Sequence, residues 1–165
     1  MRLAVTLILF LVTLALDATL SPRIALWGAP PDLMVILLVQ VAFQLPRPEN
    51  IIWPCVFGLG TDLHEDGPVG VLTLTFALLG IAIDRFQNAF FTEGLLVRVA
   101  AAGIAVFVRN FAVMISEVLR GQPPPFMLFW GQAFLSILYT AVLALALLPL
   151  LEWVLGRFTA RKRRD

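Results

Sequence analysis

The stretch FMLFWGQAFLSILYTAVLALALLPLLEWVL, residues 126–155, decides what kind of fold this chain can form. Its only charged residue is Glu152, which lies near its end. A membrane-spanning helix needs about 20 mainly apolar residues to cross about 30 Å of hydrocarbon. The stretch therefore predicts a transmembrane helix, and Pro149 within it is expected to kink that helix.

The rest of the chain has the same apolar character. Apolar residues make up 60% of the 165 residues, only 12 + 11 = 23 residues are charged, and the mean hydropathy is +0.92. Soluble domains are about 45–50% apolar and about 25% charged, so this composition excludes a water-soluble enzyme domain. It also excludes a disordered chain, which requires low hydrophobicity and high charge.

Prolines, glycines and charged residues divide the chain into six apolar blocks, and we expect each block to form one transmembrane helix. The second and third blocks are short, because each covers only about 20 Å at about 1.5 Å per residue. We favour two short spans over a buried re-entrant pair. The first block resembles a signal-peptide core but lacks a small-x-small cleavage site, which favours an uncleaved span. The expected spans are residues 3–20, 32–45, 51–63, 69–86, 95–119 and 126–155.

These spans predict an all-α integral membrane protein, a bundle of six transmembrane helices. A single polytopic membrane domain is expected over residues 1–156, followed by a basic cytoplasmic tail over residues 157–165. The tail should lie on the anionic lipid of the inner leaflet of the bilayer.

Basic residues predict the orientation of the bundle. With the N-terminus inside, the cytoplasmic side holds five arginines besides the four basic residues 161–164, and the outer side holds two, so the positive-inside rule assigns both termini to the cytoplasm. Trp27 and Trp130 then fall at the outer interface. Trp53 and Trp153 fall at the inner one, as an aromatic belt requires. The inner arginines are Arg2, Arg47, Arg85, Arg98 and Arg157, and the outer ones are Arg23 and Arg120.

One face of the fifth span combines small and basic residues. Small residues let helices approach closely in lipid, so this face should point into the bundle. Arg109 lies near the middle of the span, and an arginine at that depth must be paired or wetted. We expect either an internal ion pair that fixes helix register or a contact with a ligand or partner. The face consists of Arg98, Ala102, Ala105, Arg109, Ala112 and Ser116.

Polar residues on other spans are also expected to point inward. Asp17, Asp62 and Glu117 fall at the outer ends of their spans and could surround Arg109. Two further stripes are Thr73, Ala77, Gly80 and Asp84 on the fourth span, and Gln132, Ser136 and Tyr139 or Thr140 on the sixth.

Patterns for catalysis or metal binding are weak. The only cysteine is Cys55 and the only histidine is His64, which excludes an intrachain disulfide, a thiolate metal cluster and a His-rich zinc site. Neither a nucleophile elbow nor a phosphate-binding loop is present. The acidic turn at residues 62–66 could hold a divalent metal on a lipid phosphate, although a solvated turn is the commoner explanation. We expect no enzyme activity, no metal, no cofactor and no nucleic-acid partner.

Motifs in the middle of the chain resemble the bacterial rod-shape-determining MreD family. Pro31-Asp32-Leu33 opens the second block, Gly58-Leu59-Gly60-Thr61-Asp62 closes the third, and Gly67 precedes Gly70-Val71-Leu72 at the fourth. Ile115-Ser116-Glu117 and the basic tail are also similar to the family. The resemblance covers nearly the whole chain in layout, and its recognisable motifs lie between residues 31 and 80.

The resemblance implies a non-enzymatic membrane scaffold of the cell-elongation complex, in the bacterial inner membrane. It implies an MreC-like partner and, through it, MreB filaments and RodA with its transpeptidase. The residues expected to form a partner-binding surface or an intramembrane polar cluster are Asp17, Asp32, Gly58, Asp62, Gly67, Gly70, Arg109 and Glu117. The small-residue face at Ala101 and Ala105 could receive a partner helix.

An alternative role follows from the family's six-helix layout, which resembles the substrate-binding subunits of energy-coupling-factor transporters. In that role Arg109, Asp17 and Glu117 would line an outward-facing pocket for a vitamin-like small molecule. Those subunits usually carry an Ala-x-x-x-Ala docking motif on the first span, and Ala4, Ala15 and Ala18 form no such pair. A lipid-modifying enzyme that uses the turn at residues 62–66 is a third, weaker possibility.

Overall fold

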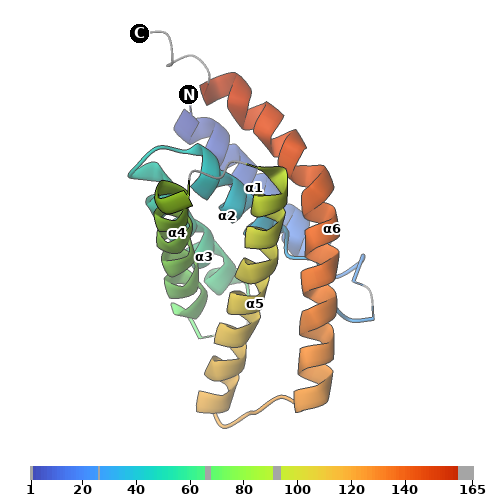
Figure 1. Ribbon diagram of the computed structural model, residues 1–165. Coiled ribbons are helices and arrows are strands. Elements are labelled where there is room, and N and C mark those ends of the chain that lie inside the picture. Colours follow the sequence, from blue (N-terminus) through green and yellow to red (C-terminus); the bar gives the residue numbers. More distant parts are fainter. Residues whose placement is uncertain (1, 26, 66–67, 91–93, 160–165) are drawn as a thin grey trace.

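The computed structural model describes residues 2–25, 27–65, 68–90 and 94–159, which form a bundle of six α-helices (Figure 1). The prediction of an all-helical fold with six helices is confirmed, and the second and third helices are the shortest, with 12 and 16 residues. The helices are α1 (Arg2–Thr19), α2 (Leu33–Gln44), α3 (Glu49–His64), α4 (Val71–Phe90), α5 (Leu95–Leu119) and α6 (Phe126–Thr159).

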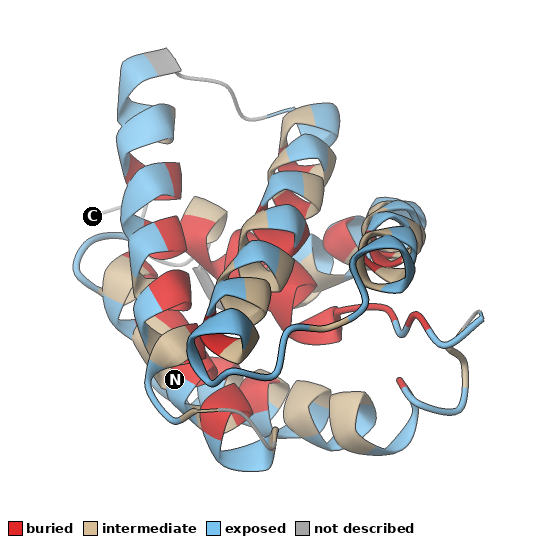
Figure 2. Cartoon of the chain, turned by 90° about the horizontal axis from the view of Figure 1, so that it is seen from below, coloured by how far each residue is buried: buried red, intermediate tan, exposed pale blue. Residues whose placement is uncertain are grey.

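Helix α2 forms the centre of the bundle. It contacts all five other helices, and its residues from Met34 to Val41 are almost completely buried (Figure 2). A continuous apolar run without an amphipathic stripe is typical of a helix that is surrounded on every side. Gln40 is the polar exception in this run, and it is fully buried. The other five helices cover α2, and the start of α1 and the end of α6 lie at the same end of the molecule (Figure 1).

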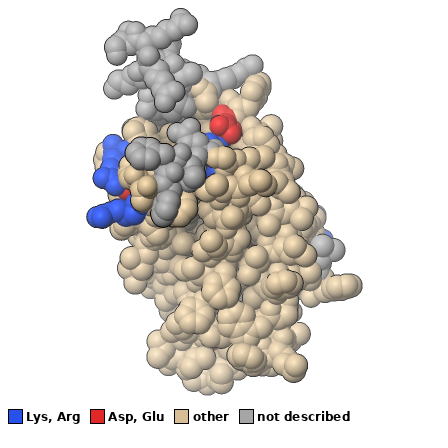
Figure 3. All heavy atoms as spheres, viewed as in Figure 1, with Lys and Arg blue, Asp and Glu red and all other residues tan. Residues whose placement is uncertain are grey.

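Many large apolar side chains lie on the surface of the bundle. On the face seen in Figure 3, charged side chains gather near the end that carries the chain termini, and the remainder shows almost none. Large apolar side chains such as Leu96, Leu119 and Met127 are at least three-quarters exposed. Soluble monomers rarely expose apolar surface this extensive. Two helical segments, Leu95–Leu119 and Phe126–Gly156, have the length and hydropathy to cross a membrane. That the other four helices also cross it stays a prediction.

Glycines on α3 and α4 allow these two helices to pack closely. A Cβ atom on Gly58 would lie 2.5 Å from the Cα of Thr73 and 2.6 Å from the carbonyl oxygen of Leu72. A Cβ atom on Gly80 would lie 2.8 Å from the Cγ of Pro54. Contacts shorter than 3.0 Å are sterically forbidden, so the α3–α4 interface requires glycine at position 58, where backbone atoms are the obstacle.

The structure places two predicted features differently. Trp53, expected at the inner interface, is buried and packs against Phe57 with ring centroids 5.8 Å apart. The α5 face containing Arg98, Ala102 and Ser116 is buried as predicted. Ala105 on that face is fully buried in the chain's own core, so it has no free surface for a partner helix.

Candidate functional site

Polar groups gather where the chain enters α2. Asp32 is the N-cap of α2, and its Oδ1 accepts a hydrogen bond from the backbone N–H of Val35 at 3.0 Å. Such a cap provides a hydrogen-bond acceptor for one of the N–H groups in the first turn of the helix, which have no partner within the helix. The two prolines before Asp32 lack N–H groups, so only their carbonyl oxygens and the N–H of Asp32 itself need partners here.

Side chains from α6 and the α1–α2 loop supply those partners. The hydroxyl of Ser21 donates to the carbonyl oxygen of Pro31 at 2.6 Å, and the hydroxyl of Ser136 donates to that of Pro30 at 2.9 Å. The backbone N–H of Asp32 donates to the hydroxyl of Thr140 at 3.0 Å. Helix α2 can therefore begin among buried side chains, because each of these backbone groups is hydrogen-bonded.

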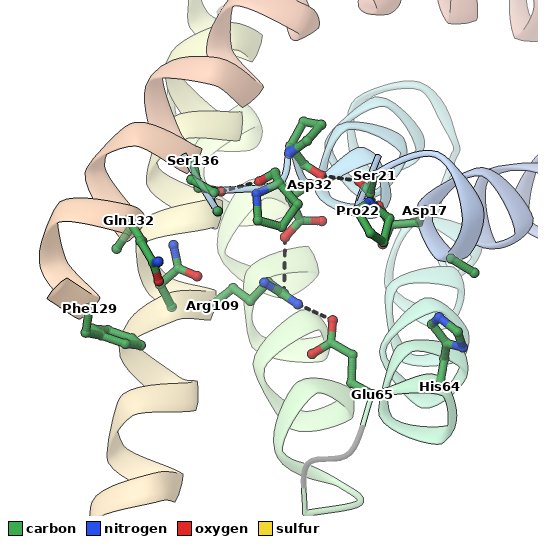
Figure 4. A pocket seen from close by; sticks show the side chains of 17 residues that line it. Asp17, Ser21, Pro22, Asp32, His64, Glu65, Arg109, Phe129, Gln132 and Ser136 are labelled. Atoms are coloured by element: carbon green, nitrogen blue, oxygen red, sulfur yellow. Dashed lines mark hydrogen bonds and ion pairs between the residues drawn. The ribbon is translucent and has the colours of Figure 1, made fainter. Parts of the chain in front are cut away.

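Arg109 of α5 joins this network through two carboxylates. Its Nε lies 3.1 Å from Oδ2 of Asp32, and its Nη2 pairs with Glu65, which follows the last residue of α3 (Figure 4). The side chain of Arg109 is 18% exposed and that of Asp32 only 5%. One guanidinium thus links α5 to the start of α2 and to the end of α3, so the mostly buried charge of Arg109 is paired with carboxylates.

A cavity of about 320 Å³ lies beside Arg109. Asp17 and His64 lie on one side of it and Gln132 and Phe129 on the other (Figure 4). Its polar lining residues are Asp17, Ser21, Asp32, His64, Glu65, Arg109, Asn110, Gln132 and Ser136. Such a volume is in the range of small-ligand sites, which begin at about 300 Å³.

Asp62 has a separate role at the corner between α3 and α4. Its carboxylate accepts hydrogen bonds from the backbone N–H groups of Gly70 (2.9 Å), Leu72 (3.0 Å) and Thr73 (2.8 Å), and from the Thr73 hydroxyl. Leu72 and Thr73 belong to the first turn of α4 and Gly70 immediately precedes it, and at such a helix start free N–H groups and the helix dipole favour a negative charge. Gly70 has φ +106°, a backbone conformation that glycine adopts without strain.

A second set of ion pairs lies at the other end of the bundle. Arg47, in the turn between α2 and α3, pairs with Asp84 of α4, which also accepts a hydrogen bond from Asn50 at 2.8 Å. The hydrogen bond to this carboxylate raises the pKa of the Arg47 guanidinium above its ordinary value. Arg98 of α5 pairs with Glu152 of α6 at 2.9 Å.

The structure brings some of the predicted site residues together and separates others. Asp17, Asp32 and Arg109 line one cavity. Glu117, expected near Arg109, instead pairs with Arg120 at 3.4 Å and lines a smaller cavity of about 150 Å³. Asp62 lines that smaller cavity too, and its carboxylate holds α4 rather than Arg109. Gly67 lies outside the described residues.

Sequence reasoning missed Glu65 as a partner of Arg109, because the turn at residues 62–66 looked like a solvated loop. It also missed Ser21, which bridges Asp17 and Pro31. The polar stripe on the sixth span did point to Ser136 and Thr140, and both are buried against the start of α2.

These features define a class of protein: a bundle of apolar helices, two of them long enough to cross a membrane, around an internal network of ion pairs. The chain belongs to the MreD family, because the model of that family, described as rod shape-determining protein MreD, matches residues 1–158. This is a membrane protein family of rod-shape determination, and it is generally non-enzymatic. No curated protein and no solved structure matches the chain.

Proposed function

We propose that this chain is a non-enzymatic membrane scaffold of the bacterial cell-elongation complex and that it binds an MreC-like partner. Through that partner it would connect to MreB filaments and to RodA with its transpeptidase. The observation that carries this proposal is the family match over residues 1–158. The site supports it, because Arg109 and Asp32 pair with each other and fix neighbouring helices, which suits a rigid platform.

Partner recovery tests this function. Tagged protein purified from its native membranes in mild detergent should enrich an MreC-like protein, with RodA or its transpeptidase, when the eluate is read by mass spectrometry. The matched control is an unrelated tagged protein of the same membrane. Enrichment of transporter ATPases and their membrane coupling subunit would contradict the scaffold role.

The second candidate function is a small-molecule binding subunit of a transporter. The cavity of about 320 Å³ beside Arg109 favours it, because transporter subunits need a site of this kind. The partner experiment separates the two functions, since a transporter subunit copurifies with ATPases.

We further propose six spans in the bacterial inner membrane with both termini in the cytoplasm. Cysteine labelling tests this topology, because Cys55 is the only native cysteine and can be replaced by serine. Gly94 and Gln122 flank α5 at opposite ends, and both are exposed. In intact spheroplasts a membrane-impermeant maleimide should label Gln122→Cys. It should label Gly94→Cys only after the membrane is permeabilised. The reverse pattern, or equal labelling of both, would contradict the topology.

A further inference from the structure

The cavity beside Arg109 holds more acidic than basic groups. Three carboxyl groups, those of Asp17, Asp32 and Glu65, line it together with one guanidinium, that of Arg109. Arg109 pairs with Asp32 and Glu65. Asp17 forms no ion pair within the described part of the chain, and its Oδ1 lies 3.0 Å from the Ser21 hydroxyl oxygen, whose single proton it shares with the carbonyl oxygen of Pro31.

Three buried polar atoms of the lining make no hydrogen bond, and they are Oδ2 of Asp32, Nε of Arg109 and Nδ2 of Asn110. Oδ2 of Asp32 and Nε of Arg109 lie 3.1 Å apart and form an ion pair with each other. Nδ2 of Asn110 has no such partner. Buried polar groups are nearly always hydrogen-bonded in native proteins. An occupant with N–H donors would pair with the carboxylate of Asp17, which has no ion pair among the described residues.

The chemistry of the lining selects the kind of cation. Among the described residues, no three His, Cys, Asp or Glu side chains are placed to hold a metal ion. The lining also includes apolar groups, such as Ala18, Phe129 and Ala133, which suit an aliphatic stem. An ammonium or guanidinium group carries several N–H donors for carboxylates and makes charge-assisted hydrogen bonds with them.

We propose that this cavity binds an organic cation, an ammonium or guanidinium group on a short aliphatic stem, with Asp17 as its principal counter-ion. The surrounding residues come from the C-terminal ends of α1 and α3, the loop before α2, the middle of α5 and the first part of α6. In the proposed topology all of these parts except the middle of α5 lie toward the outside, so the cation enters from there. The same chemistry is available from a lysine or arginine side chain of a partner and from a free amine.

Binding to the purified full chain in detergent tests the proposal. The probes are agmatine and cadaverine, and 1,5-pentanediol is the uncharged control with the stem of cadaverine. We expect a saturable rise in melting temperature with both amines and none with the diol. Asp17→Asn should weaken amine binding about tenfold or more, because it removes the unpaired carboxylate. Glu117→Gln is the matched control, since this carboxyl group lies outside the cavity, and it should bind the amines as the wild type does.

A second variant keeps the proposal testable if Asp17→Asn fails to fold. Ala18→Leu narrows the cavity without removing a charge, and it should also weaken amine binding. No saturable shift with either amine, an equal shift with the diol, or full affinity in Asp17→Asn that keeps the wild-type melting temperature would each overturn the proposal.

The source of the cation is identified separately. If a partner supplies it, saturating agmatine should release the copurified partner from the complex isolated from native membranes. If a free amine supplies it, mass spectrometry of the washed protein should detect that amine, and agmatine should leave the partner bound. The binding measurement uses the purified chain alone, so its outcome does not depend on whether the scaffold proposal holds.

Discussion

Replacing Arg109 with alanine is expected to cause a large loss of stability. The substitution leaves the carboxylates of Asp32 and Glu65 without their cation, and the Asp32 side chain is only 5% exposed. Removing one partner of a buried ion pair costs roughly 3–5 kcal/mol in general, because the remaining charge stays buried and unpaired. Arg109 also holds three segments together, so its loss should loosen α2 against both α5 and the end of α3.

The measurement is thermal unfolding of the purified protein in detergent. Arg120→Ala is the matched control, because Arg120 also pairs with a carboxylate but is 47% exposed, and exposed pairs contribute only about 0–1 kcal/mol. The double variant Arg109→Ala with Asp32→Asn should recover part of the loss, since it removes one unpaired charge. A melting temperature for Arg109→Ala equal to that of Arg120→Ala would contradict this role for the ion pairs.

Gly58→Ala should separate α3 from α4, with the second largest effect. The added Cβ would lie 2.5 Å from a backbone atom of α4, and backbone atoms cannot move aside as a flexible side chain can. Overpacking of this kind costs typically about 1–3 kcal/mol. The shift should also disturb the hydrogen bonds that Asp62 accepts from the first turn of α4, because both contacts lie at the same corner.

Gly103→Ala is the matched control, since its Cβ would meet only the Cγ2 of Ile137 at 3.7 Å, an ordinary contact. Alanine favours a helix over glycine by about 1 kcal/mol, so this control should be neutral or slightly stabilising. Unfolding followed by circular dichroism separates the two variants. If Gly58→Ala unfolds at the same temperature as Gly103→Ala, the close approach of α3 and α4 is wrong.

The sequence predicted the helices and their buried faces because both depend on local patterns. Six apolar blocks became six helices, and the face of α5 that carries Arg98, Ala102 and Ser116 is buried as its spacing required. The same reasoning identified Arg109 as a buried cation that needs a partner. This identification needs no knowledge of the tertiary structure, because an unpaired arginine on an apolar helix costs free energy wherever the neighbouring helices lie.

The partners of Arg109 could not be predicted in the same way. Helical spacing shows which face a residue is on, but it does not show how high a neighbouring helix sits or which way a turn bends. Glu117 lies two turns from Arg109 on the same helix, and it pairs with Arg120 instead. The turn after α3 brings Glu65 to Arg109, whereas the carboxylate of Asp62 accepts hydrogen bonds from backbone N–H groups at the start of α4. These contacts depend on tertiary arrangement.

Depletion in its own bacterium tests most directly whether this chain works in rod-shape determination. Cell width and shape are measured by microscopy after the chain is removed and after wild-type protein is restored. The family assignment predicts that depleted cells lose their rod shape and become round, and that the wild type restores it. Depleted cells that keep their rod shape and width would contradict this role.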